Sequence, residues 1–148
     1  TSRLSSRLTS VSGWSVRADW DGIRWKDFLK EIVVDPGATH VIFTGYGEIY
    51  TTTVSLLDLQ APRVMLVTGV AGDPLEAEYG GPLRMVIPNL YGYKSCKWLT
   101  QIEFINRMEG GYWEDRGYSR SGIIEPGTTF DVNSKTHKEI KGGEVVDF

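Results

Sequence analysis

Short runs of β-branched and aromatic residues, closed by glycine or proline, constrain the fold of this chain more than any other feature. HVIFT at 40–44 is followed by Gly45 and Gly47, and VMLVTGV at 64–70 precedes a Gly-Asp-Pro turn. Runs of this length and composition are typical of strands. Similar runs lie at 49–54, 83–87 and 98–107, with a Ser/Thr-rich one at the start that enters a loop at Gly13 and a very short one at 23–25. The sequence therefore predicts at least six short strands.

Only one segment has good helical spacing. Residues 26–33 place Phe28, Leu29 and Ile32 on one face, and Asp35-Pro36-Gly37 ends the pattern. With one or two short helices among many strands, the predicted fold class is α+β, with mostly short mixed β-strands in a coiled or barrel-like sheet. We expect one domain over residues 1–122. Residues 123–148 are expected to form an extended tail, in which only IIE at 123–125 and EVV at 144–146 resemble strands.

Composition excludes several classes of protein. Sixteen Lys and Arg against nineteen Asp and Glu give a net charge of −3, so no basic excess favours nucleic acid or a membrane surface. A single Cys excludes an intrachain disulfide framework, and no CxxC or Cys/His cluster indicates structural zinc. The apolar runs are shorter than the ~20 residues of a membrane span. Residues 1–10 do not resemble a signal peptide, and because the chain begins without Met we expect further sequence upstream.

Isolated polar residues carry little functional signal. His40 opens an apolar strand and His137 lies in a polar segment, so both are better explained by structure than by catalysis. Asp19 and Asp21 flank Trp20 in a turn-forming sequence. No nucleophile elbow, zinc-protease motif or phosphate-binding P-loop is present.

The segment 80–98 (GGPLRMVIPNLYGYKSCKW) is different. Its two initial glycines allow a ligand to approach the backbone closely. Arg84, Lys94 and Lys97 concentrate positive charge around the 92–96 loop, where backbone N–H groups and the Ser95 hydroxyl can also donate. Forked guanidinium and point-charge ammonium groups beside such a loop suit a phosphate or another anion. The alternative is a surface loop whose basic side chains are simply solvated.

The order of three segments indicates a family. VSGWSVRADWDGIRWKDFL, then GDPLEAEYGGPLRMVIPNLYGYKSCKWLTQIEF, then GYWEDRGYSRSG resembles the molybdopterin-binding domain of the sulfite oxidase-type oxidoreductases, a family that includes the bacterial methionine sulfoxide reductase catalytic subunit. The resemblance spans residues 8–122, and GGPLR followed by YGYKSxKW is its most specific part. It implies a mixed α+β domain dominated by a coiled β-sheet.

The resemblance also implies a cofactor, molybdopterin, whose molybdenum is held by the pterin dithiolene and one protein cysteine thiolate. That cysteine stands in a Cys-Val-x-x-Trp-Ser stretch, which here is Ser10-Val11-Ser12-Gly13-Trp14-Ser15. The implied catalytic and metal position is therefore Ser10, whose hydroxyl is a harder donor and a weaker acid than a thiol.

Other implied cofactor contacts lie in two groups. Arg84 matches an arginine that contacts the pterin, and the loop that cradles its phosphate contains Lys94, Ser95, Cys96 and Lys97. Tyr79 stands where relatives usually have His or Asn, and Gly45 where a pterin-contacting Thr can occur. Relatives also have an N-terminal stretch with more cofactor contacts, and some have a C-terminal immunoglobulin-like domain; neither is recognised in this sequence.

The resemblance implies oxygen-atom transfer on a small oxyanion or sulfoxide, with a small-molecule substrate or a redox partner protein and no nucleic acid. Ser10 leaves two alternatives open. One is a cofactor-free binding or structural module that retains the fold, and the other is a piece of a competent enzyme.

Overall fold

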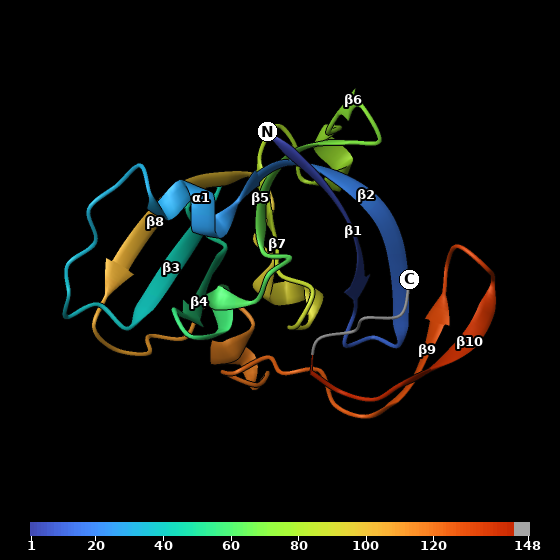
Figure 1. Cartoon of the computed structure of the whole chain (residues 1–148). Coiled ribbons are helices and arrows are strands. Elements are labelled where there is room, and N and C mark those ends of the chain that lie inside the picture. The colour runs from blue at the N-terminus through green and yellow to red at the C-terminus, as the bar shows by residue number, and fades with distance from the viewer. Residues whose placement is uncertain (144–148) are drawn as a thin grey trace.

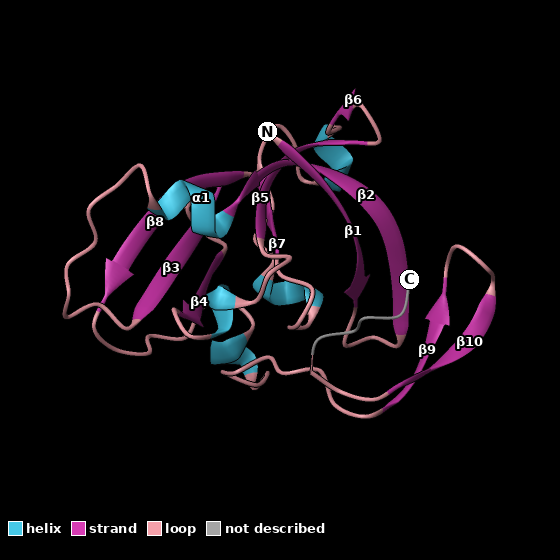
Figure 2. Ribbon diagram, in the orientation of Figure 1, coloured by secondary structure: helices cyan, strands magenta, loops and turns pink. Residues whose placement is uncertain are grey.

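The computed structural model describes residues 1–143, which form two β-sheets, one short α-helix and four 3-10 turns (Figures 1 and 2). The strands are β1 (Ser2–Thr9), β2 (Trp14–Arg24), β3 (His40–Gly45), β4 (Thr51–Ser55), β5 (Met65–Val70), β6 (Asp73–Pro74), β7 (Arg84–Val86), β8 (Leu99–Ile105), β9 (Gly127–Asp131) and β10 (Thr136–Ile140). The helical elements are α1 (Trp25–Leu29), η1 (Asp58–Gln60), η2 (Ala77–Tyr79), η3 (Gly92–Lys94) and η4 (Glu114–Arg116).

The long strand β2 organises the larger sheet. The order is β10-β9-β2-β5-β6, with β1 also paired to β2 and β7 to β5. All these pairings are antiparallel except that of β2 with β9. The register of β2 against β5 shifts between Asp21 and Gly22. A Cβ on Gly22 would lie 2.0 Å from the Leu66 carbonyl oxygen, so glycine is required for the close approach of β5 at this irregularity.

The smaller sheet has the order β4-β3-β8 and is entirely antiparallel. Its inner face packs with α1 and one side of β5 and β7 to form the main core, in which Trp25 lies 5.7 Å from Phe43 and 6.0 Å from Phe104 between ring centroids. A second core lies between the β1–β2 hairpin and the other side of β5 and β7, around Trp20 and Met65. Strand β7, whose first residue is Arg84, lies between the two cores.

The strand predictions at 40–44, 49–54, 64–70, 83–87 and 98–107 correspond to β3, β4, β5, β7 and β8, with no end shifted by more than two residues. The predicted helix at 26–33 is shorter and begins one residue earlier, at Trp25. Of the expected strand at 23–25, the first two residues are the end of β2, which runs continuously from Trp14, whereas Trp25 begins α1. Within residues 1–143 the mostly β architecture agrees with the prediction, but the strand pairings show no closure into a barrel. No helix in that range is long and apolar enough to cross a membrane.

The segment expected as an extended tail contains a hairpin. β9 and β10 pair with each other, and β9 adds to β2 in parallel at Trp14 and Ser15 (Figure 2). Of the two fragments expected to resemble strands, 123–125 forms only a bridge from Ile123 to Leu90, and 144–146 lies outside the described residues. The hairpin is attached by a buried ion pair, in which the Arg7 guanidinium lies 2.8 Å from a carboxylate oxygen of Asp131.

Asp131 should make the stability of the domain sensitive to acid. Burial raises the pKa of this carboxyl, but hydrogen bonds from Arg7, Ser134 and the Asn133 N–H outweigh it and leave the pKa below its ordinary value. The stabilisation is complete above the unfolded-state pKa of ~3.9 and is lost as the pH falls below it. Asp131→Asn should lower the free energy of unfolding by about 3 kcal/mol at pH 7, since the buried Arg7 guanidinium loses the negative charge of its Asp131 partner. Urea unfolding at pH 7 and pH 3 measures this. If the free energies of unfolding of variant and wild type differed by the same amount at both pH values, the prediction would be wrong.

Candidate functional site

A cavity of about 320 Å³ lies between the β1–β2 hairpin and the loops that contain η3 and η4. Its wall combines hydroxyl, cationic and aromatic side chains. The lining residues are Leu8, Thr9, Ser10, Val11, Ser12, Trp14, Val16, Arg84, Gly92, Tyr93, Lys97, Trp113 and Tyr118. Three of the residues proposed from the sequence, Ser10, Arg84 and Lys97, are therefore brought together from distant parts of the chain.

Ser10 lies in the tight turn between β1 and β2. Its N–H donates to the Trp14 carbonyl (2.7 Å) and its carbonyl accepts from the Gly13 N–H (3.2 Å). Gly13 has a φ of +95°, which favours glycine, so this residue lets the turn close. The Ser10 hydroxyl oxygen accepts from the Ser12 N–H at 3.0 Å. The turn thus holds an oxygen donor at the cavity wall.

Arg84 is a buried cation without a carboxylate partner among residues 1–143. Its guanidinium donates to three backbone carbonyls, those of Met85 (3.0 Å), Tyr79 (2.8 Å) and Ser95 (3.2 Å). Burial lowers its pKa to about 10. Because a guanidinium has five N–H donors, these bonds leave donors for a ligand, and the desolvated charge favours an anion.

Lys97 adds a second positive charge to the same wall. Its ammonium lies 4.7 Å from the centre of the Trp98 ring, and its pKa is lowered by burial and by the nearby Arg84. The stem of Lys97 packs over Gly80, where a Cβ would lie 2.6 Å from the lysine Cγ. Because the neighbouring Arg84 disfavours the charged form of Lys97, an anion bound at this wall would stabilise the lysine charge.

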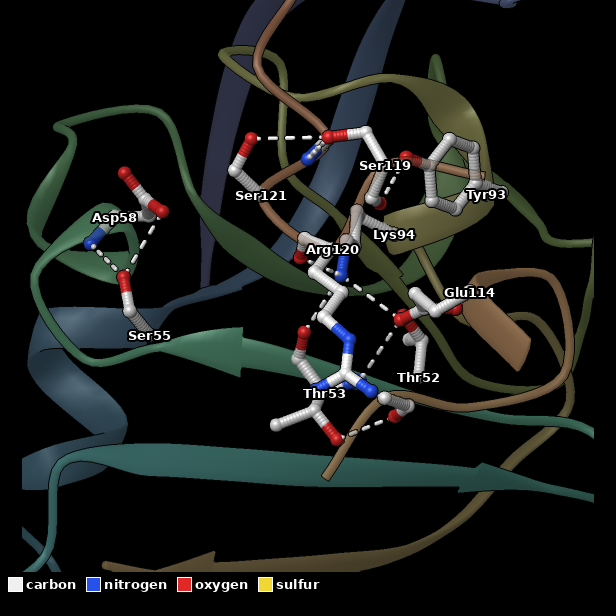
Figure 3. Close-up of polar contacts among 12 residues, drawn as sticks. Thr52, Thr53, Ser55, Asp58, Tyr93, Lys94, Glu114, Ser119, Arg120 and Ser121 are labelled. Atoms are coloured by element: carbon white, nitrogen blue, oxygen red, sulfur yellow. Dashed lines mark hydrogen bonds and ion pairs between the residues drawn. The ribbon is translucent and has the colours of Figure 1, made fainter. Parts of the chain in front are cut away.

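Lys94 does not line the cavity. Its ammonium is fully buried and donates to the Thr53 carbonyl (2.7 Å), the Arg120 carbonyl (2.6 Å) and a carboxylate oxygen of Glu114 (2.8 Å) (Figure 3). Burial lowers its pKa, and the Glu114 contact opposes that effect. All three N–H donors are used inside the protein, so the geometry gives no support to the prediction that Lys94 contacts a bound anion.

Three other predicted contacts are not among the residues that line the cavity. Ser95 is buried, and its hydroxyl accepts from the Ile87 N–H at 2.8 Å. The Tyr79 side chain is exposed, while its carbonyl accepts from Arg84. Gly45 packs against the Lys97 carbonyl, which a Cβ would approach to 2.8 Å. These residues frame Arg84 and Lys97, and a direct cofactor contact by any of them stays a prediction.

Cys96 is fully buried and is not among the lining residues. Burial raises the pKa of its thiol to about 12, with a smaller opposing effect from Arg84. It therefore has the properties of an inert core residue rather than of a metal ligand.

Sequence reasoning did not single out the aromatic part of the wall. Tyr93, Trp113 and Tyr118 line the cavity, with the Tyr118 ring 5.6 Å from Tyr93 and 5.1 Å from Trp113. The signal was present in YGYK and GYWEDRGY, which carry the family resemblance. Thr9 was also missed, and its buried hydroxyl has no hydrogen-bond partner among the described residues.

The fold and this site define a β-rich domain with a cationic, aromatic-walled cavity. Residues 2–113 match the oxidoreductase molybdopterin-binding domain, and the chain belongs to that family.

Relatives of known name agree with this assignment. The chain is 40% identical over 114 residues to the uncharacterized oxidoreductase YuiH of Bacillus subtilis, covering 76% of this chain and 57% of that protein. It is 32% identical over 132 residues to the protein-methionine-sulfoxide reductase catalytic subunit MsrP of Xanthomonas campestris, covering 80% and 41%. It is 31% identical over 123 residues to the mitochondrial sulfite oxidase of Drosophila melanogaster, covering 78% and 21%. The chain therefore spans about half or less of the length of these relatives.

Among solved structures, the sulfane dehydrogenase SoxCD of Paracoccus pantotrophus superimposes with a TM-score of 0.67. The match covers 96% of this chain and 39% of that one at 14% sequence identity. At that identity the similarity establishes the fold alone.

The burial of Cys96 leads to a test of its reactivity. At pH 8 the folded protein should not react with a thiol-specific chromogenic disulfide, because the thiol is inaccessible and protonated. One equivalent should react after unfolding in guanidinium. Rapid reaction of the folded protein would show that Cys96 is open to the cavity.

Proposed function

We propose that the cavity binds the molybdopterin cofactor, with its anionic end at Arg84 and Lys97 and its metal end facing Ser10. The observation that carries the proposal is the buried Arg84 guanidinium, which has no carboxylate partner among residues 1–143 and lines the same cavity as Ser10. Family membership supplies the identity of the ligand, and the unneutralised charge supplies a physical reason for its retention.

The residues present fit the two ends of this cofactor unequally. The phosphate end would meet the two cations Arg84 and Lys97, which offer charge and hydrogen bonds. The metal end meets a serine hydroxyl, an oxygen donor where the family resemblance implies a thiolate. Oxygen ligands are harder than thiolates, so metal affinity and redox potential would both differ.

When bound, the cofactor would supply two-electron oxygen-atom transfer. The chain's own residues would orient it and control access to it. Arg84 and Lys97 would hold the anionic end, and the Ser10 hydroxyl would lose its proton on binding a metal. Trp14, Trp113 and Tyr118 would form an apolar wall that limits water around a small oxyanion or sulfoxide.

The substrate class is proposed from the relatives. MsrP is named for protein methionine sulfoxide, and sulfite oxidase is named for sulfite. Both of these compounds contain a sulfur atom bonded to oxygen. Because the chain covers only part of each relative, a redox partner protein or partner subunit is likewise a proposal. The relative YedZ1 of Azospira oryzae, 32% identical over 117 residues, is named as a subunit of a putative reductase.

Ser10 supports a second function, a cofactor-free binding or structural module. In that case Arg84 and Lys97 would bind a different anion or none. The structure offers no thiol that could replace the missing ligand, because Cys96 is buried away from the lining residues.

Removal of the two cations should abolish retention of the cofactor. In Arg84→Ala with Lys97→Ala, the loss of two charge-assisted hydrogen bonds of ~1.5 kcal/mol each should weaken binding by about 100-fold. Pterin content of protein purified from a host that synthesises the cofactor measures the effect. Lys26→Ala with Lys30→Ala removes two charges from exposed positions on and just after α1 and is the matched control. Equal pterin content in both double variants would count against the site.

Restoring the thiol separates the two functions. Ser10→Cys should raise the molybdenum content of the purified protein, because a thiolate is a softer and more readily formed ligand. Ser12→Cys, which places a thiol two residues along the same cavity wall, is the control and should leave the metal content unchanged. Elemental analysis decides between them, and absence of molybdenum from Ser10→Cys would favour the cofactor-free module.

A further inference from the structure

Three of the four aromatic residues that line the cavity lie outside the strands. Tyr93 lies in η3, Trp113 immediately precedes η4, and Tyr118 follows it. Neither 3-10 turn has a hydrogen bond from a capping side chain. Short turns of this kind have little stability of their own, so contacts with other parts of the protein must determine where the three rings lie.

One buried ammonium supplies such contacts at both ends of the Trp113–Tyr118 segment. Lys94 donates to the carboxylate of Glu114, the residue after Trp113, and to the carbonyl of Arg120, two residues after Tyr118 (Figure 3). Its third bond goes to the Thr53 carbonyl in β4. A single atom thus fixes both ends of the segment against a strand of the smaller sheet.

Glu114 adds further hydrogen bonds between the segment and β4. The carboxylate oxygen that contacts Lys94 also accepts from the Thr52 hydroxyl (2.7 Å) and from the Thr53 N–H (3.3 Å). Both side chains of the Lys94–Glu114 ion pair are completely buried. In such surroundings charge-assisted bonds are short and directional, so they restrict position more than an apolar contact would.

The third ring is attached to the same unit. Tyr93 is the residue before Lys94, and its hydroxyl donates to the Ser119 carbonyl at 2.5 Å. The Tyr93 carbonyl in turn accepts a hydrogen bond from the Tyr50 hydroxyl. Tyr93 and Trp113 are therefore the residues immediately before Lys94 and Glu114. Tyr118 lies between Glu114 and Arg120, both of which Lys94 contacts.

We propose that Lys94 and Glu114 are positioning residues, which set the placement of Tyr93, Trp113 and Tyr118 and so the shape of the ligand cavity. The pair contacts no ligand itself. The proposal concerns the geometry of the protein and does not depend on which ligand the cavity binds. It differs from a purely stabilising role, which would change the unfolding transition and leave the native positions of the rings as they are.

The test uses the full chain labelled with 5-fluorotryptophan and observed by ¹⁹F NMR. Each of Trp14, Trp20, Trp25, Trp98 and Trp113 gives a resonance, and Trp113→Phe assigns that of Trp113. In Lys94→Met with Glu114→Gln, both charges are removed together, so neither is left buried and unpaired. The Trp113 resonance should shift and broaden, while that of Trp25 in the main core should stay in place.

The ion pair of Arg7 with Asp131 provides a matched control. It has the same shortest distance of 2.8 Å and nearly the same burial, but it joins β1 to the C-terminal hairpin. Arg7→Met with Asp131→Asn should lower the melting temperature and leave the Trp113 resonance unmoved. An unmoved Trp113 resonance in the folded Lys94 and Glu114 double variant would overturn the proposal, as would an equal shift in the control.

A milder variant keeps the test decisive if the double variant does not fold. Glu114→Gln preserves size and one acceptor oxygen, but the bond from the ammonium to a neutral amide is weaker than to a carboxylate. The Trp113 resonance should shift in the same direction by a smaller amount. An unchanged resonance in this variant would also contradict the proposal. No cofactor is needed, so a failure of the proposed function leaves the result interpretable.

Discussion

The cost of burying positive charge governs how this domain is organised. Arg7, Arg84 and Lys94 all lie in the interior, where a cation is stable only if its charge and its hydrogen bonds are matched. Asp131 matches Arg7 and Glu114 matches Lys94, each at 2.8 Å. Each of these pairs joins segments far apart in the chain and so contributes to the tertiary structure. Arg84 instead donates to backbone carbonyls and lies over the Trp20 ring, and it has no carboxylate partner among residues 1–143.

The position of Arg84 follows from the arrangement of the sheets. β7 lies between two cores and carries the guanidinium at its first residue, where the carbonyls of Tyr79 and Ser95 meet it. Gly80 allows the Lys97 stem to pass close by, so both cations reach the same wall. The β1–β2 turn supplies the opposite part of the cavity through Ser10. Ser10 and the two cations thus come from separate elements of the cavity wall.

Much of the fold could be predicted from local sequence because its strands are short, β-branched and bounded by glycine or proline. The C-terminal hairpin could not, since its attachment depends on Arg7, which lies 124 residues from Asp131. The predicted helix was too long because periodicity alone does not show where tertiary contacts end a helix. Charge density indicated Arg84 and Lys97, which the structure places at the cavity wall, but it could not distinguish Lys94 from them. Its partner Glu114 lies twenty residues further on, and only the folded chain shows that the ammonium points away from the cavity.

Ser10 is structurally separate from the two cations of the cavity wall. No hydrogen bond joins Ser10 to Arg84 or Lys97 among the described residues, so a change of side chain in the turn leaves the cationic wall intact. Under the proposed function, affinity for the anionic end and coordination of a metal would then be independent properties. The side chain at position 10 would alter the second without the first. Binding of the pterin and retention of molybdenum are therefore two separate questions for this domain.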